Sequence, residues 1–422
     1  MIMKRLYITI FFSFIIAGEI SAQVDNTLYV KDAITENRAK LYQNLVNNSI
    51  TKNLSLPLSD SSEDNWQDAF LALELLNYRS AWIDGTISSV FNAIDKRSQG
   101  FQRAFLELIY TNYPDAFIPQ IVDFIKKTDN TKLFSMCAEY LFMNNRKGEY
   151  RDLIVKRMTT IISHFTDDNI DPFFTVLIDK LLLKKPGKPP IADLLNNSFL
   201  HNETILYSFQ RKNRNYPGLA MIRGRDGQFI KDESGDYFSV PQLARSISNM
   251  PGYLTNGNTP QGIFKMNGEG YSKSNFIGPT PNIQMLMPFE RTADAEDSLV
   301  QSFGNHYSSL LPASWKNYFP VYESYYAGKT GRTEIIAHGT TVNPEYYINQ
   351  PYYPQTPTQG CLCAKEIWST ADGKRLESDQ QKLVNALKAA GGANGYCVVI
   401  EIDDLEKPVS LSDILSYLKS EN

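Results

Sequence analysis

The chain has 422 residues, of which 42% are hydrophobic and 12% aromatic, so it carries enough apolar material for two folded domains. The formal net charge is −4 and no long run of Lys and Arg occurs, which argues against a nucleic-acid partner. Four cysteines are too few for a disulfide scaffold of this length.

Residues 1–22 have the pattern of a secretory signal peptide. Two basic residues precede an apolar run from Leu6 to Ala17, and the small pair Ser21-Ala22 marks a cleavage site. This run is shorter than the roughly 20 residues that a helix needs to cross a bilayer. We therefore expect an exported or periplasmic protein that begins at Gln23, with a short uncleaved membrane anchor as the alternative.

Helical periodicity follows over a long interval. Between Ser61 and Leu183, apolar residues recur at helical spacing, as in Trp66, Phe70 and Leu73, with room for five to seven helices. The proline-rich segment 184–190 then interrupts the pattern. We predict an all-α domain over residues 23–200, for which a protein partner is one expected role; the oligomeric state stays open.

The pattern changes to short β-type runs from Thr204 onward. They are Ile205–Phe209, Leu219–Arg223, Gln228–Ile230, Gly262–Met266, Ile283–Phe289, Thr333–Ala337 and Tyr396–Ile402, with a hairpin turn at Arg225-Asp226-Gly227. Helices are expected at Val240–Asn249, Asp297–Leu311, Ser378–Ala390 and Leu411–Lys419. The predicted fold class is α+β in two domains: the all-α domain and a β-rich domain over residues 204–422.

Two residues of the second domain suggest thiol chemistry. A free thiol has a pKa of about 8.5 and is mostly protonated at neutral pH, so a nucleophilic cysteine needs a base. Cys361 follows Gly360, and His338 ends a predicted strand that would hold its ring rigidly. Glycine before the cysteine lets a substrate backbone approach. A purely structural histidine at a strand end is the alternative.

Three motifs together resemble a known family. His338-Gly339-Thr340 followed by Thr358-Gln359-Gly360-Cys361 is similar to the signature of the L,D-transpeptidase (YkuD-type) catalytic domain. Thr259-Pro260-Gln261-Gly262 is similar to the Thr-Pro-x-Gly segment upstream in that family, and Leu219–Ile230 to its early hairpin. The resemblance covers roughly residues 204–405. It implies a β-rich exported enzyme that acts on peptidoglycan stem peptides without a metal or other cofactor.

The resemblance also implies a role for each matching residue. Cys361 would attack the carbonyl of the third stem residue and expel the terminal D-alanine. His338 would be the base, with the Gly339 carbonyl orienting its ring. Backbone N–H groups of Gly360 and Cys361 would form the oxyanion hole.

Residues beside the nucleophile differ from the usual family pattern. Thr358 and Gln359 are expected to contact substrate, yet Gln359 stands where many members have a second histidine. Cys363 stands where Arg or Asn is common. Three states are open to Cys363: a disulfide with Cys397, a redox cap on Cys361, or a packed thiol.

Three functions remain as hypotheses. The first is an L,D-transpeptidase-like acyltransferase. The second is a hydrolase, an L,D-carboxypeptidase or endopeptidase, that uses the same site with water as the acceptor. The third is a non-catalytic cell-wall scaffold whose catalytic half is degenerate.

Overall fold

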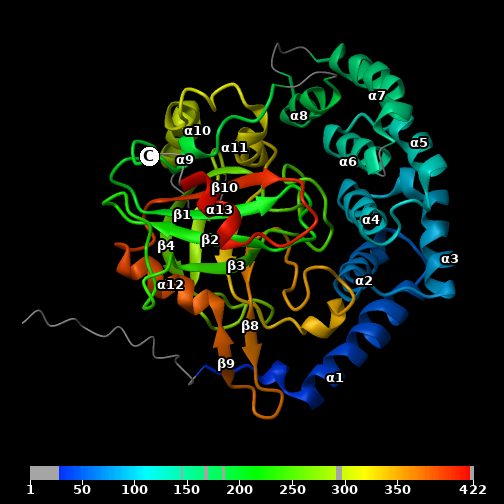
Figure 1. The fold of residues 1–422 in the computed structure, drawn as a ribbon. Coiled ribbons are helices and arrows are strands. Elements are labelled where there is room, and N and C mark those ends of the chain that lie inside the picture. Colours follow the sequence, from blue (N-terminus) through cyan, green and yellow to red (C-terminus); the bar gives the residue numbers. More distant parts are fainter. Residues whose placement is uncertain (1–27, 144–145, 166–169, 183–185, 291–296, 419–422) are drawn as a thin grey trace, which may run out of the picture.

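A computed structural model describes residues 28–143, 146–165, 170–182, 186–290 and 297–418. The expected signal segment, residues 1–22, lies outside the described residues. In the described ranges, no helix is long and apolar enough to cross a membrane. The helical N-terminal half forms an arc along one side of a β-barrel, which is built by the C-terminal half (Figure 1).

The N-terminal half consists of α-helices and short helical turns, as predicted. Its α-helices are α1 (Thr35–Asn44), α2 (Glu63–Leu76), α3 (Ala81–Ser89), α4 (Gln99–Asn112), α5 (Ile118–Lys127), α6 (Thr131–Phe142), α7 (Lys147–Ile162) and α8 (Pro172–Leu181). A π-helical segment, η2 (Leu45–Lys52), continues α1. The helices begin where the sequence supplies caps: Ser80, Ser98 and Asn130 each accept a backbone N–H of the first turn of α3, α4 or α6.

Aromatic rings fill the core of this half. Phe70, Phe101 and Phe105 are almost fully buried and pack with their rings tilted or edge-on to one another. Cys137 on α6 is also fully buried in this core. The helical spacing in the sequence therefore identified the residues that form the core.

The C-terminal half is a closed mixed barrel. Its strands are β1 (Ile205–Arg211), β2 (Gly218–Arg223), β3 (Ser239–Leu243), β4 (Gly262–Gly270), β5 (Asn282–Leu286), β6 (Ile336–His338), β7 (Leu362–Ala364) and β10 (Tyr396–Asp403). Around the barrel the order is β1-β10-β4-β5-β6-β7-β3-β2. The pairs β1–β10 and β6–β7 are parallel and the other pairs are antiparallel. Strands β8 (Glu366–Trp368) and β9 (Arg375–Ser378) form a separate two-stranded sheet.

Alternate residues of the strands face the interior and the exterior of the barrel. All eight strands contribute to one buried cluster, which includes Leu206, Ala337, Leu362 and Cys397, so this cluster marks the interior. Leu383 of helix α12 (Asp379–Ala389) belongs to the same cluster, so this helix closes the barrel. The exterior is covered by α9 (Ala192–Leu195), α10 (Asp297–Leu310) and α13 (Leu411–Leu418) over β1, β2, β4 and β10. Helix α11 (Glu323–Lys329) contacts β4.

One predicted helix is wrong. Residues 240–249 form β3 and a loop, because this segment lies between β2 and β7 and pairs with both. Val240 enters the barrel interior, so tertiary pairing overrides the local pattern. The predicted strand Gln228–Ile230 makes only an isolated bridge, at Phe229. The turn before it is as predicted, with Gly224 N–H donating to Gln228 O at 2.9 Å.

The two halves share buried contacts. Met250, Tyr253 and Leu254, from the loop after β3, lie in the core of the helical half. The Tyr253 hydroxyl donates to Glu139 Oε1 of α6 at 2.7 Å, and the Tyr347 hydroxyl donates to the Leu75 carbonyl of α2 at 2.9 Å. The barrel and the helices therefore pack against each other through specific side chains.

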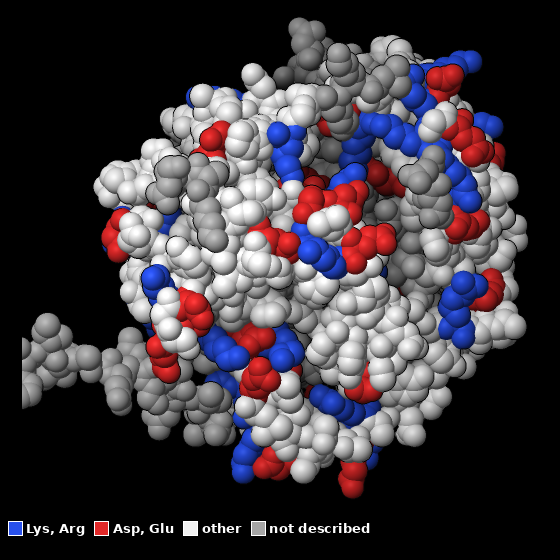
Figure 2. All heavy atoms as spheres, in the orientation of Figure 1, with Lys and Arg blue, Asp and Glu red and all other residues white. Residues whose placement is uncertain are grey.

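Charged side chains of both signs are interspersed on the face of the molecule drawn in Figure 2. Below the surface, the buried Arg211 guanidinium forms ion pairs with Asp403 at 2.5 Å and with Asp413 at 2.6 Å. Neither sign forms an extended patch on this face.

Candidate active site

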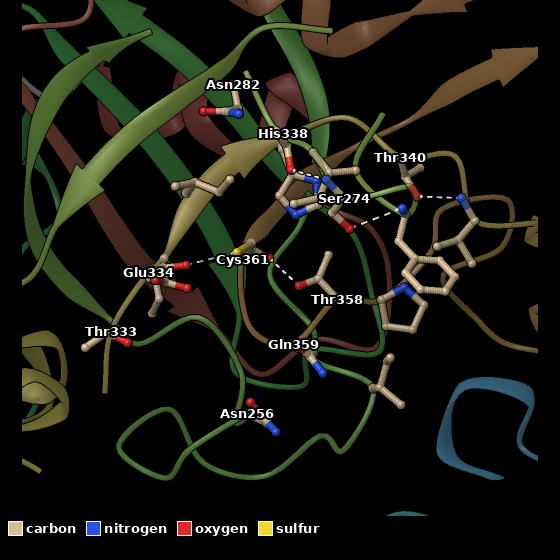
Figure 3. Close-up of a pocket in the computed structure, with 18 of the residues that line it drawn as sticks. Asn256, Ser274, Asn282, Thr333, Glu334, His338, Thr340, Thr358, Gln359 and Cys361 are labelled. Atoms are coloured by element: carbon tan, nitrogen blue, oxygen red, sulfur yellow. Dashed lines mark hydrogen bonds between the residues drawn. The ribbon is translucent and has the colours of Figure 1, made fainter. Parts of the chain in front are cut away.

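The pairing of β6 with β7 brings His338 and Cys361 to the same side of the sheet. In this parallel pair, Ala337 lies opposite Leu362, and both point into the barrel interior. Side chains alternate along a strand, so His338 and Cys361 must point to the exterior. Figure 3 shows both residues at the wall of one pocket.

That pocket is a cavity of ≈1010 Å³ between the two halves of the chain. The barrel side presents the predicted His338, Thr358, Gln359 and Cys361 together with several amides. The opposite wall comes from the helical half: Leu45, Ser49, Asp68, Leu71, Ala72 and Leu75. The sequence motifs lie in the barrel half alone, so they could not reveal that the helices complete the site.

The His338 ring is held in one orientation. Its Nδ1 atom hydrogen-bonds the Gly339 carbonyl, which is the contact implied by the family resemblance. A carbonyl can only accept, so Nδ1 carries the proton and Nε2 is the basic nitrogen. Burial lowers the pKa of His338 to about 4, against the effect of the Gly339 carbonyl. The ring is therefore neutral, and able to accept a proton, at neutral pH.

The Cys361 thiol is protonated at neutral pH. Burial raises its pKa to about 11, while the Ile336 N–H and the Arg332 guanidinium oppose this rise. Sγ donates to the Glu334 carbonyl at 3.5 Å (Figure 3). Within the described residues, no hydrogen bond joins Cys361 to His338. The thiol proton is therefore directed at the Glu334 carbonyl and not at the imidazole.

Hydrogen bonds to two threonines fix the turn before Cys361. Thr358 Oγ1 accepts from Gly360 N–H at 2.9 Å and donates to the Cys361 carbonyl at 3.0 Å. Thr259 Oγ1 donates to the Gly360 carbonyl at 2.9 Å, which brings the upstream Thr-Pro-x-Gly segment to the site. Gly360 has a φ of +119°, a conformation that favours glycine.

These bonds bear on two of the expected roles. The Gly360 N–H, expected in the oxyanion hole, is engaged by Thr358, whereas the Cys361 N–H has no partner in the described part of the chain. The Thr358 hydroxyl has both its partners within the turn, so its contribution here is to hold the backbone at Cys361. Gln359 is exposed and lines the cavity.

Glu366 is a site residue that the sequence did not reveal. It lies behind Gly339, where a Cβ would come within 2.2 Å of Glu366 Cδ. Its Oε1 atom accepts from the hydroxyls of Thr280 at 2.5 Å and Ser378 at 2.6 Å. Burial raises the pKa of Glu366 to about 7, so this carboxyl supports the His338-Gly339 segment in a partly protonated state.

Arg332 is a second site residue that the sequence did not reveal. Its guanidinium is buried and donates to the carbonyls of Gly252, Gly257 and Asn258, at 2.5 Å for Gly257 and 2.7 Å for Asn258. Burial lowers the pKa of Arg332 to about 10, and the nearby Cys361 opposes the shift. A lone arginine six residues before a histidine carries no sequence signal, so only the fold reveals this position.

All four cysteines are free thiols. The possible disulfide between Cys363 and Cys397 is wrong, because β7 and β10 are separated by β4, β5 and β6 and Cys397 points into the barrel interior. Cys363 is also not bonded to Cys361. It lies buried on the exterior of β7 as a packed thiol, close to Tyr347 and Thr356 of the segment before Cys361.

Among the described residues, no three His, Cys, Asp or Glu side chains gather as ligands for a metal ion. Comparisons with protein-family models, with curated proteins and with solved structures give no match to this chain. The residues and the geometry of the site are therefore the basis for a function.

Proposed function

We propose that this protein is an exported L,D-transpeptidase-like acyltransferase that acts on peptidoglycan stem peptides through an acyl-enzyme on Cys361. The observation that carries the proposal is that His338, at the end of β6, and Cys361, directly before the adjacent parallel strand β7, both line one wall of a large cavity. Their motif neighbours support it: Gly339 orients the imidazole, and Thr259 and Thr358 hold the nucleophile turn.

The first half of the reaction forms the acyl-enzyme. The Cys361 thiol attacks the carbonyl carbon of the third stem residue, a C–S bond forms, and the thiol proton passes to His338 Nε2. The Cys361 N–H donates to the oxygen that becomes negative. The C–N bond to the terminal D-alanine then breaks, and His338 returns the proton to the leaving amine.

The second half transfers the acyl group. An amine of a neighbouring stem attacks the thioester, a C–N bond forms, the C–S bond breaks, and His338 carries the released proton back to the thiol. Water in place of the amine gives hydrolysis with the same residues. The cavity of ≈1010 Å³ is at the upper end of the usual range of ligand pockets, about 300–1,000 Å³, so a stem peptide has room to bind.

The test is mass spectrometry of the mature protein incubated with tetrapeptide muropeptides. We expect wild type to gain the mass of the muropeptide less that of the released D-alanine. Cys361→Ala should neither gain this mass nor release D-alanine, and His338→Gln should form the adduct at least about 100-fold more slowly.

The products then distinguish the three hypotheses. Cross-linked muropeptides indicate transpeptidation, and free tripeptides indicate hydrolysis. If wild type forms no adduct, releases no D-alanine, and binds muropeptides as tightly as Cys361→Ala, both enzyme hypotheses are wrong and the scaffold hypothesis stands. Because Cys137, Cys363 and Cys397 are buried, an adduct is expected on Cys361 alone.

A further inference from the structure

The Arg332 guanidinium lies directly behind the nucleophile turn. A Cβ on Gly360 would come 1.8 Å from Arg332 Nη2 and 2.5 Å from the Gly257 carbonyl, so only glycine leaves room for the cation. Arg332 is 5% exposed and makes its hydrogen bonds to carbonyls of one loop, residues 252–258. The turn that carries Cys361 therefore rests on a buried cation and the loop that holds it.

The helical half holds this loop. Asn256 Nδ2 donates to Glu107 Oε2 of α4 at 3.1 Å, and the Tyr253 hydroxyl donates to Glu139 Oε1 of α6 at 2.7 Å. Tyr253 is fully buried among the helices. A continuous series of contacts thus leads from α4 and α6 through the loop and Arg332 to Gly360 and Cys361.

The charges around the thiol give Arg332 a second effect. The charged and titratable groups that act on Cys361 are Arg332, Glu334, Glu290 and the neighbouring thiol of Cys363, and His338 shares the cavity wall. Arg332 is the cation among these groups, and the two carboxylates oppose it. Together with the Ile336 N–H, Arg332 therefore favours a thiolate at Cys361 by compensating its charge.

We propose that Arg332 is a positioning residue of the active site: its guanidinium supports the Gly360-Cys361 turn, favours the Cys361 thiolate, and connects the turn to the helical half. The inference rests on the proposed function in that Cys361 is taken as the nucleophile. It differs from that proposal because it concerns the reactivity of the thiol itself, which can be measured without any peptide substrate.

The experiment is alkylation of the full mature chain by iodoacetamide, a neutral reagent, at several pH values from 6 to 10. Cys361→Ala gives the background rate of alkylation at the three buried thiols. We expect Arg332→Gln to lower the Cys361 alkylation rate at pH 8 about tenfold and to move the rise of the rate to higher pH. Arg332→Lys keeps the charge, so its rate should stay within about threefold of wild type.

Arg223 provides the matched control. It is also a buried arginine bonded to three backbone carbonyls, those of Leu195, Asn196 and Phe199, but it neither lines the cavity nor acts on Cys361. We expect Arg223→Gln to lower the melting temperature without changing the pH profile of alkylation. If Arg332→Gln and Arg332→Lys each show the wild-type pH profile, the assigned role is wrong and Arg332 is purely structural, whatever the muropeptide assay shows.

Asn256→Gly tests the connection to the helices and does not depend on the folding of the Arg332 variants. Asn256 has a left-handed φ of 57°, which glycine adopts freely, so the change removes the amide bond to Glu107 without backbone strain. We expect Cys361 alkylation at pH 8 to slow by about twofold to threefold. An unchanged rate would overturn the connection through Asn256 to the helical half.

Discussion

At the scale of single residues, His338 and Cys361 are both neutral at neutral pH, and no hydrogen bond between them occurs in the described residues. The Cys361 thiol donates to the carbonyl of Glu334, a residue with an unusual positive φ of 62°. Glu290 stabilises that conformation by accepting the Glu334 N–H at 2.7 Å. A strained backbone at a functional site persists only where its surroundings enforce it. We infer that Glu334 presents its carbonyl to the thiol until substrate displaces it.

Gly360 admits no side chain. Its φ is +119° and an added Cβ would collide with Arg332 Nη2 at 1.8 Å. We expect Gly360→Ala to lower the free energy of unfolding by about 2–4 kcal/mol and to abolish adduct formation on Cys361. Urea unfolding and mass spectrometry measure the two effects.

Gly85 in α3 provides the control for that change. It has open space around its Cβ position and lies within a helix. Gly85→Ala should raise the free energy of unfolding by about 0.5–1 kcal/mol and leave the adduct unaffected. Equal effects of the two substitutions would contradict the steric argument for Gly360.

Glu366 should make stability depend on pH. Its pKa rises from 4.5 in the unfolded chain to about 7 in the fold, so folding favours the protonated carboxyl. The stabilisation of the fold by the protonated Glu366 carboxyl is complete below pH 4.5 and is lost as the pH rises through about 7. The unfolding free energy of Glu366→Gln minus that of wild type should therefore be about 2–3 kcal/mol higher at pH 8 than at pH 4.5.

The measurement is urea unfolding of both proteins at the two pH values. A glutamine oxygen can keep the bonds from Thr280 and Ser378. Any cost of burying the amide nitrogen is the same at both pH values, so it cancels in the comparison. A stability difference that does not change with pH would show that Glu366 does not titrate in this range.

At the scale of secondary-structure elements, the loop after β3 connects the barrel to the helices. We expect Tyr253→Phe to lower the unfolding free energy by about 1–3 kcal/mol, because Glu139 loses a buried donor and keeps Lys180 at 2.6 Å. Chemical denaturation provides the measurement.

Tyr271 is a suitable control for the same substitution, since it is 76% exposed. Tyr271→Phe should change stability by less than about 0.5 kcal/mol. If Tyr253→Phe changed stability as little as Tyr271→Phe, the hydroxyl contact with Glu139 would not stabilise the packing of the loop on α6.

At the scale of the whole molecule, the two halves should unfold together. Met250, Tyr253 and Leu254 of the C-terminal half lie in the core of the N-terminal half, so neither half buries its apolar surface alone. We expect scanning calorimetry to give one transition whose calorimetric enthalpy equals the van't Hoff enthalpy. Two resolved transitions would mean that the shared contacts are too weak to couple the halves.

Much of this architecture could be predicted from local sequence patterns. Periodicity identified most helices and most strands. The three motifs identified His338 and Cys361, which line the cavity, and Gly339, whose carbonyl accepts a hydrogen bond from the His338 ring. Periodicity predicted a helix in place of β3 and missed the short strands β7, β8 and β9. Strands of three to five residues carry too few side chains for a period to show.

By itself, the sequence determined which residues could perform thiol chemistry and that two structural classes share the chain, since residue type and local spacing carry both kinds of information. The tertiary structure alone decided which residues surround His338 and Cys361. It placed Arg332 behind Gly360, Glu366 behind Gly339, and the helices across the cavity from Cys361. It also separated Cys363 from Cys397. These neighbours are distant in the sequence, and strand order and packing, which no local pattern encodes, bring them together or keep them apart.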